Sequence, residues 1–398
     1  METIPAIQIN SGCRLYQEVL KHRFNDVLQL KMIENFHRDL PKKVVFFFEY
    51  VGNNIKILET INEIIKQYSQ IQIFIVIDDC YEGLTNQEFL IQLRQIANEN
   101  DNLDDWMLLS SNKTLEKDFV EIFNTANNFL YFNIHPYMYE YDNVVPNQLE
   151  PTVNNQLRQK KFLCVNRQER VHRLRTIDFL SESNILPQCF ASCQLGDYAP
   201  LLDENKTFLS QNPRVEQYQD ADLQSVILPP QSKTRLKKML PLELDVKNYQ
   251  HKTFATQMPS LTEYFRESYI SIVTEGDFSS KSGKRQFTEK VLKCFAHHHP
   301  FIVVGLPGTL SLLQEEGFLT FSSIINEDYD KEENDDKRLR MIFDEIEKLN
   351  SLNMNQTKRM YESIMPVLDH NYDNYVKVYN TNRPTTLVNK LLKWYYDL

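Results

Sequence analysis

The sequence predicts an α/β protein with two domains, each built on a parallel β-sheet. Short apolar runs of strand length alternate along the chain with longer amphipathic segments typical of helices. Strands that alternate with helices are joined by right-handed crossovers and pair in parallel. Five of the nine glycines fall within residues 268–318, where a strand–helix–strand–helix pattern is clearest. The length of 398 residues is sufficient for two separate cores.

The first domain is predicted over residues 1–157. Its clearest strand, residues 44–48, is a continuous apolar run flanked by lysines and a glycine, as is typical of a central parallel strand. Further strands are predicted at 72–77, 106–109 and 129–134, with helices over the first 40 residues and at 55–68, 86–97 and 115–126. Residues 145–161 contain prolines and amides without periodicity and are interpreted as the linker.

The second domain is predicted over residues 158–398. A strand at 162–165 opens it, and Asn166 is expected to cap the next helix with Glu169 in a capping box. Strands at 269–273 and 301–304 are followed by helices that begin at Thr288 and after Gly308. The charged run 327–338 is expected to be a solvated loop, and the last predicted helices are 339–349, 355–376 and 387–398.

The composition argues against several classes of protein. A net charge of −10 disfavours general nucleic-acid binding, which needs a basic surface. No apolar run reaches the length of a membrane span, and the N-terminus lacks the basic and apolar regions of a signal peptide. The six cysteines show no metal-binding spacing, which favours reduced thiols and a cytoplasmic location.

Basic residues gather where the strand 162–165 meets the following helix. Arg167, Arg170 and Arg173 are spaced three residues apart, which brings side chains to one face of a helix. The free N–H groups of a helix start attract anions, and arginine adds a bidentate phosphate donor. We therefore predict an anion site here, and the alternative is a solvated basic face.

A second cluster consists of Glu275, Thr288, Glu289 and Lys290. Glu275 ends a predicted strand, the other three begin the next helix, and a loop rich in glycine and serine joins them. A glutamate at a helix start is commonly only a cap. Paired carboxylates at the edge of a parallel sheet also suit the hydroxyls of a ribose, and a neighbouring lysine suits phosphate.

Four titratable side chains follow predicted strands of the first domain and are candidate general bases. They are Glu49, Asp78, Asp79 and His135. The adjacent aspartates have two further interpretations, as ligands of a divalent metal or as solvated loop acids. Three consecutive histidines at 297–299 point in different directions on a helix and make a poor metal site. The sequence contains no GxxxxGK[ST], no GxGxxG after a strand and no GxSxG.

Segments of the second domain resemble glycosyltransferases of the GT-B fold, and most closely the α-1,3-fucosyltransferase group. A Thr-Glu-Lys motif opens a helix at residues 288–290, after a strand that ends in an acidic residue. A set of uncharacterised viral and bacterial glycosyltransferases shares further motifs in the same order. Here these motifs are residues 164–167 with 172–173, 299–310, 317–321 and 327–330.

The resemblance implies two facing Rossmann-type domains with parallel sheets and C-terminal helices. It implies transfer of a sugar from a nucleotide-diphosphate sugar to an acceptor hydroxyl. Glu289 would bind the ribose, Lys290 and Arg167 would face the diphosphate, and Glu275 would lie near the sugar or ribose. The first domain would be the acceptor side, and the last helix would cross back to it. The resemblance favours a GDP-sugar as donor, with a glycan, a protein or a small molecule as acceptor.

Together these patterns predict which residues contact the donor. They are Asn166, Arg167, Arg170, Arg173, Glu275, Thr288, Glu289, Lys290 and Gly305. Neither a cofactor nor a divalent metal is expected, because these cations and helix starts would stabilise the leaving diphosphate. Two alternatives stay open: a metal-dependent transferase that uses Asp78 and Asp79, and a non-catalytic α/β module that binds a glycan or a protein.

Overall fold

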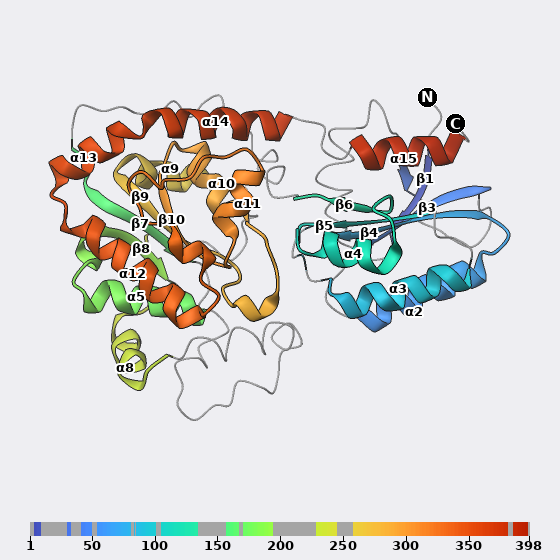
Figure 1. Cartoon of the computed structure of the whole chain (residues 1–398), viewed down its shortest axis with the longest axis horizontal. Helices are drawn as coiled ribbons and strands as arrows, with labels where there is room; N and C mark the ends of the chain where they lie inside the picture. The colour runs from blue at the N-terminus through green and yellow to red at the C-terminus, as the bar shows by residue number, and fades with distance from the viewer. Residues whose placement is uncertain are drawn as a thin grey trace. The chain divides into compact units, whose positions relative to one another are not determined.

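The computed structural model describes residues 4–8, 30–32, 41–49, 54–80, 83, 85–100, 105–133, 157–166, 170–193, 228–244, 258–380 and 385–396. The chain divides into two compact units, one of Met1–Met138 with Asn380–Leu398 and the other of Tyr139–Tyr379 (Figure 1). Each unit contains a sheet whose strands are all paired in parallel, which confirms the predicted α/β fold class. Within the described ranges no helix is long and apolar enough to cross a membrane.

The first unit has a sheet of strand order β2-β1-β3-β4-β5-β6. Its strands are β1 (Ile4–Gln8), β2 (Leu30–Met32), β3 (Lys43–Glu49), β4 (Gln72–Asp79), β5 (Trp106–Ser110) and β6 (Phe129–Tyr131). The strands predicted at 44–48, 72–77 and 106–109 are confirmed. The helix predicted over the first 40 residues is wrong at β1 and β2, which are too short to show a strand period in the sequence.

Alternating side chains divide the core of the first unit between the two faces of the sheet. Val44, Phe46 and Phe48 pack on one face against helices, whereas Val45 and Phe47 pack on the other. The helices of the first face are α2 (Asn54–Gln67), α3 (Gln87–Glu99) and α4 (Leu115–Phe123). An unbroken apolar run is therefore required in β3, because both of its faces are buried.

The last helix, α15 (Thr385–Tyr396), covers part of the second face of this first sheet. Figure 1 shows α15 in red across the sheet from α2, α3 and α4. Trp394 lies edge-on to Phe74, and the Lys43 amine donates to the carbonyls of Trp394 and Tyr395 at the helix end. The division inferred from the sequence assigns residues 380–398 to the second domain, whereas these contacts join α15 to the first unit.

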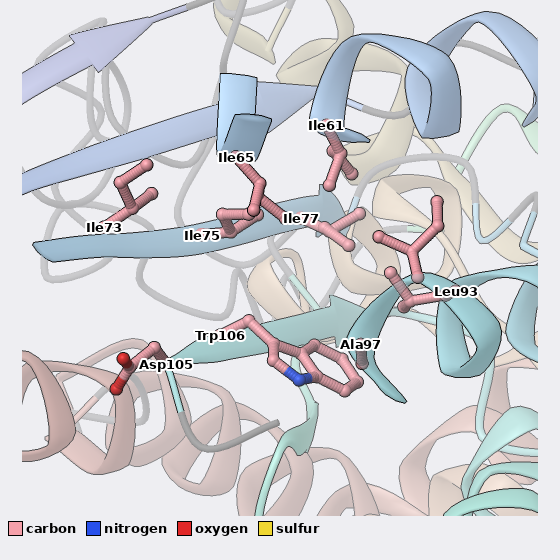
Figure 2. Close-up of a pocket in the computed structure, with 10 residues that line it drawn as sticks. Ile61, Ile65, Ile73, Ile75, Ile77, Leu93, Ala97, Asp105 and Trp106 are labelled. Carbon is pink, nitrogen blue, oxygen red and sulfur yellow. The ribbon is translucent and has the colours of Figure 1, made fainter. Parts of the chain in front are cut away.

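A small cavity lies in the core of the first unit between α2, α3, β4 and β5 (Figure 2). Isoleucines of α2 and β4 and the Trp106 ring line it, and its volume is about 20 Å³. A space of this size holds about one water molecule. The cavity is a packing gap and not a site for a nucleotide or a sugar.

The second unit has a sheet of strand order β10-β9-β7-β8. Its strands are β7 (Lys160–Asn166), β8 (Cys189–Cys193), β9 (Ser268–Thr274) and β10 (Phe301–Val304). The chain moves from β7 to β8 in one direction across the sheet and from β9 to β10 in the other. The order therefore reverses between β7 and β9, and ligands of open parallel sheets bind at such a switch point.

Eight helices of the described residues belong to the second unit. They are α5 (Val171–Glu182), α8 (Pro230–Met239), α9 (Met258–Arg266), α10 (Glu289–Ala296), α11 (Thr309–Glu315), α12 (Asp335–Ser351), α13 (Met354–Ser363) and α14 (Met365–Asn380). Short 3₁₀ turns occur at Leu186–Gln188, Ser280–Ser282 and Asp328–Lys331. The single helix predicted at 355–376 is wrong, because the chain starts a new helix at Met365 with Pro366 in its first turn.

Candidate functional site

The carboxyl ends of β7 and β9 form the centre of the candidate site. β7 ends at Asn166 and β9 ends at Thr274, and these strands are neighbours at the switch point. The Thr274 hydroxyl donates to the side-chain oxygen of Asn166, and both residues are buried. Asn166 does not cap a helix as predicted, because its oxygen is bound to β9 and Arg170 holds the N-cap position of α5.

Glu275 links the exit of β9 to the start of α10. Its carboxylate accepts from the Thr288 backbone N–H at 3.1 Å and from the Thr288 hydroxyl. Thr288 caps α10 by accepting from the backbone N–H of Lys290. Three residues of the predicted donor cluster are thus adjacent, although 13 positions separate Glu275 from Thr288.

The Lys290 ammonium group lies close to two carboxylates at this connection between β9 and α10. The Lys290 amine lies 2.8 Å from Glu289 Oε1 and 3.9 Å from Glu275 Oε2. Burial raises the pKa of Glu275, which is 3% exposed, and the nearby Glu289 raises it further. Lys290 and the hydrogen bonds from Thr288 oppose this rise. The site therefore combines a buried carboxyl of raised pKa with a partly exposed ammonium group.

Gly305, the residue after β10, packs directly against Glu275. A Cβ atom at Gly305 would lie 2.9 Å from Val303 Cγ1 and 3.2 Å from both Cβ and Cγ of Glu275. Real Cβ atoms essentially never show the first distance, and the second is tighter than nine in ten real Cβ contacts. Glycine is required here because the Glu275 side chain occupies the space that a side chain would need.

Helix α5 fixes the backbone of the β9 exit. His172 Nε2 and Arg173 Nη2 each donate to the Glu275 carbonyl at 3.0 Å. Burial, and then the charge of neighbouring Arg170, lower the pKa of Arg173 to about 10. Burial and the Arg173 charge also lower the pKa of His172, so this imidazole is neutral at pH 7. Arg173, which the sequence predicts as a donor contact, binds backbone in this structure.

Arg170 and Lys284 hold Asp277 between them. Arg170 Nη1 lies 3.4 Å from Asp277 Oδ1 and donates to the Gly276 carbonyl, and the Lys284 amine lies 3.0 Å from Asp277 Oδ2. Burial alone would raise the pKa of Asp277, but the two cations outweigh it and the pKa is lowered. Asp277 and Lys284 are absent from the predicted site, although both belong to the basic loop that follows Glu275.

The acidic run also supplies residues that the sequence reasoning missed. Asp330 accepts from the backbone N–H groups of Leu310 and Ser311 and so caps α11. Asp335 and Arg338 form a buried ion pair at the start of α12, with 2.6 Å between Oδ1 and Nη2. The prediction of a solvated loop is therefore wrong at these three residues. The spacing of Asp335 and Arg338 gives no signal of burial, since Asp328 and Lys331 of the same run are also three residues apart and both are exposed.

The candidate bases of the first unit differ in accessibility. Asp79 is 2% exposed and accepts from the Thr85 N–H and the Ser110 hydroxyl, while Asp78 is 4% exposed and accepts from the Cys80 N–H. Glu49 pairs with Asp78 in the sheet register and is half-buried. His135 of the first unit, and likewise Arg167 of the predicted donor set, lie outside the described residues.

The structure gives the three consecutive histidines a packing role. The His297 ring stacks on Phe265, the His298 ring stacks on Tyr372, and His299 Nδ1 lies 2.8 Å from the Ser271 hydroxyl. Across the part of the chain that the structure describes, no group of three or more His, Cys, Asp or Glu side chains could hold a metal ion.

Comparison with known proteins gives similarity at the level of structure alone. The sequence matches no protein-family model and no curated protein. An α1,3-fucosyltransferase crystal structure is similar with a TM-score of 0.42 and 10% identity, over 92% of this chain and 81% of that chain. A putative UDP-N-acetylglucosamine 2-epimerase from Listeria monocytogenes is similar with a TM-score of 0.37 and 9% identity, over 91% of each chain. At these TM-scores the likeness carries no information about the reaction.

Proposed function

We propose that the protein is a glycosyltransferase that moves a sugar from a nucleoside-diphosphate sugar to an acceptor hydroxyl. The observation that carries this proposal is the convergence of charged groups at the exits of β7 and β9. Arg170 and Lys284 lie beside Asp277, and Lys290 lies beside Glu289 and Glu275. A switch-point position, several cations and paired carboxylates together suit a ligand that combines a diphosphate with a ribose.

Each charged group has a distinct task in this proposal. Lys290, Lys284 and Arg170 stabilise the negative charge that develops on the diphosphate when the bond to the sugar breaks. Glu289, which is 3% exposed, is assigned to the ribose hydroxyls from the family resemblance alone. Glu275 holds the N-terminus of α10 in place through Thr288 and need not touch the donor. The cations supply the electrostatic stabilisation without a divalent metal, and the resemblance favours guanine as the base.

The acceptor hydroxyl needs a general base, and we propose Glu49 for this task. A base must reach the proton that it removes. Asp78 and Asp79 are both buried and hold local backbone or serine hydrogen bonds, whereas Glu49 is half-buried at the exit of β3. Accessibility thus ranks Glu49 before the two aspartates.

A panel of sugar nucleotides tests the function. The purified protein is incubated with GDP-, UDP-, CMP- and dTDP-sugars in excess chelator, and release of the nucleotide is measured with and without candidate acceptors. We expect release from one nucleoside-diphosphate series, with Glu49→Gln lowering kcat by about 10²- to 10⁴-fold and leaving donor affinity unchanged. Absence of release from every donor, or release that requires a divalent metal, would contradict the proposal.

A further inference from the structure

The loop between β9 and α10, residues 276–287, is anchored by one buried arginine of α12. The Arg338 side chain is 1% exposed. It donates to the carbonyls of Phe278 in the loop, Gly305 after β10 and Glu332 before α12. One guanidinium group thus joins three backbone segments that are far apart in the sequence.

Asp335 completes the anchor from the same helix. Its Oδ1 accepts from Arg338 Nη2 at 2.6 Å and from the Ser280 backbone N–H at 2.9 Å, while its Oδ2 accepts from the Ser279 hydroxyl at 2.8 Å. Burial alone would raise the pKa of Asp335, but the hydrogen bonds from Ser280, Arg338 and Ser279 lower it. The carboxylate is therefore charged at pH 7 and holds the 3₁₀ turn of the loop.

The Phe278 ring connects this anchor to α5. The Arg338 guanidinium lies 4.3 Å from the centre of the Phe278 ring, and the His172 ring stacks on the same phenylalanine at 5.4 Å with an interplanar angle of 14°. His172 in turn donates to the Glu275 carbonyl. A continuous set of contacts therefore leads from α12 through the loop to the exit of β9.

We propose that Arg338 and Asp335 are positioning residues that fix loop 276–287 for donor binding. Neither residue needs to touch the donor. They hold Phe278 to Ser280, which keeps Asp277 and Lys284 beside Arg170. The donor-binding part of this inference rests on the glycosyltransferase function proposed above. A buried ion pair is often no more stabilising than apolar packing of the same volume, and we therefore assign this pair a role in the conformation of the loop.

Arg338→Met tests this role, because methionine keeps an apolar side chain of similar length and removes every hydrogen-bond donor of the guanidinium group. We expect amide hydrogen exchange of residues 277–284 to accelerate by about tenfold or more, since each lost charged hydrogen bond contributes to the protection of the loop. The variant also leaves the Asp335 charge buried and unpaired, and the exchange of the β9 and β10 amides measures the resulting loss of global stability. The affinity for the nucleoside diphosphate of the active donor series falls by about tenfold.

The control is Arg158→Met, at the opposite end of β9. Arg158 also donates to two backbone carbonyls, those of Phe265 and Ser268, and it lies 4.1 Å from the centre of the Tyr361 ring. We expect this variant to lose stability without a change in loop exchange or nucleotide affinity. Equal losses of affinity in both variants would overturn the positioning role, and so would unchanged exchange of the loop in Arg338→Met.

Ser279→Ala provides a milder change, which is needed if Arg338→Met does not fold. It removes the hydroxyl bond to Asp335 Oδ2 and is expected to accelerate loop exchange by about threefold or more. Unaltered exchange in Ser279→Ala would then overturn the proposal. If the wild-type protein binds no nucleoside diphosphate, the glycosyltransferase proposal fails, and the exchange measurements still decide whether α12 fixes the loop.

Discussion

Replacement of Gly305 by alanine tests whether Glu275 is packed as closely as the structure shows. The new Cβ would lie 2.9 Å from Val303 Cγ1 and 3.2 Å from two carbons of Glu275. Because Val303 and Glu275 are both buried, neither side chain moves without a cost. Overpacking of this kind destabilises a protein by about 1–3 kcal/mol. For a unit of this size, each kcal/mol lowers the Tm by about 2–4 °C.

Differential scanning calorimetry measures this change, and Gly276→Ala is the matched control. No heavy atom lies within 4 Å of a Cβ built at Gly276, and its φ is not in the left-handed region. Alanine at this position is expected to leave the free energy of unfolding unchanged or to raise it by up to about 1 kcal/mol, because alanine lowers the conformational entropy of the unfolded chain. We also expect Gly305→Ala to weaken nucleotide binding, since the Glu275–Thr288 link must shift. Equal Tm values for Gly305→Ala and the wild type would refute the packing argument.

Three further predictions follow from the same geometry. The pKa of Glu275 is raised above 4.5 in the folded protein, so its ionisation costs stability at neutral pH, and this cost disappears as the pH falls through the folded pKa. As the pH is lowered from 7 to 4.5, urea titrations should therefore show the free energy of unfolding of the wild type rising relative to that of Glu275→Gln. The pKa of Asp277 is lowered below 3.8, so its charge pairs stabilise the protein above that pH, and this stabilisation is lost as the pH falls through the folded pKa. Asp277→Asn should therefore be less stable than the wild type at pH 7 and equally stable in strong acid. Asp330→Ala removes the cap of α11 and should cost about 0.5–2 kcal/mol by thermal unfolding, whereas Asp328→Ala, at an exposed position of the same run, should not.

The strands of both sheets were predictable wherever the apolar run was long enough to exclude a solvated segment. Residues 44–48 are five consecutive apolar side chains, and only a strand with two buried faces suits such a run. The short strands β1, β2 and β8 gave no comparable signal. Their pairing depends on neighbours distant in the sequence, which local periodicity does not report.

The proximity of several predicted donor-site residues could be anticipated because they follow strands or begin helices, and the ligand that they bind stays a prediction. Parallel strands place their carboxyl ends at one edge, so Asn166, Thr274 and Glu275 had to lie close together once β7 and β9 were neighbours. The roles of individual residues were less predictable. Arg173 looks like an anion ligand by its charge alone, yet burial directs it to the Glu275 carbonyl.

Arg338 and Asp335 show where sequence patterns fail. Both occur in a run so rich in charge that a solvated loop is the ordinary interpretation. They are buried because Phe278, Ser279 and Ser280 fold over them, and this contact joins segments 55 to 60 positions apart. Nothing in the local pattern of residues 327–338 distinguishes these two charges from their exposed neighbours.

The most direct test of the account is isothermal titration of the protein with GDP and UDP in excess chelator, for the wild type and for Lys290→Met. A charged hydrogen bond contributes about 1.5–3 kcal/mol, so loss of the Lys290 ammonium should weaken the diphosphate that binds by about 10- to 100-fold. Lys337→Met is the control, because Lys337 is paired with Glu332 at an exposed position of α12. We predict binding without metal, with an affinity that falls in Lys290→Met alone. Binding that is equal in both variants, or no binding by the wild type, would contradict it.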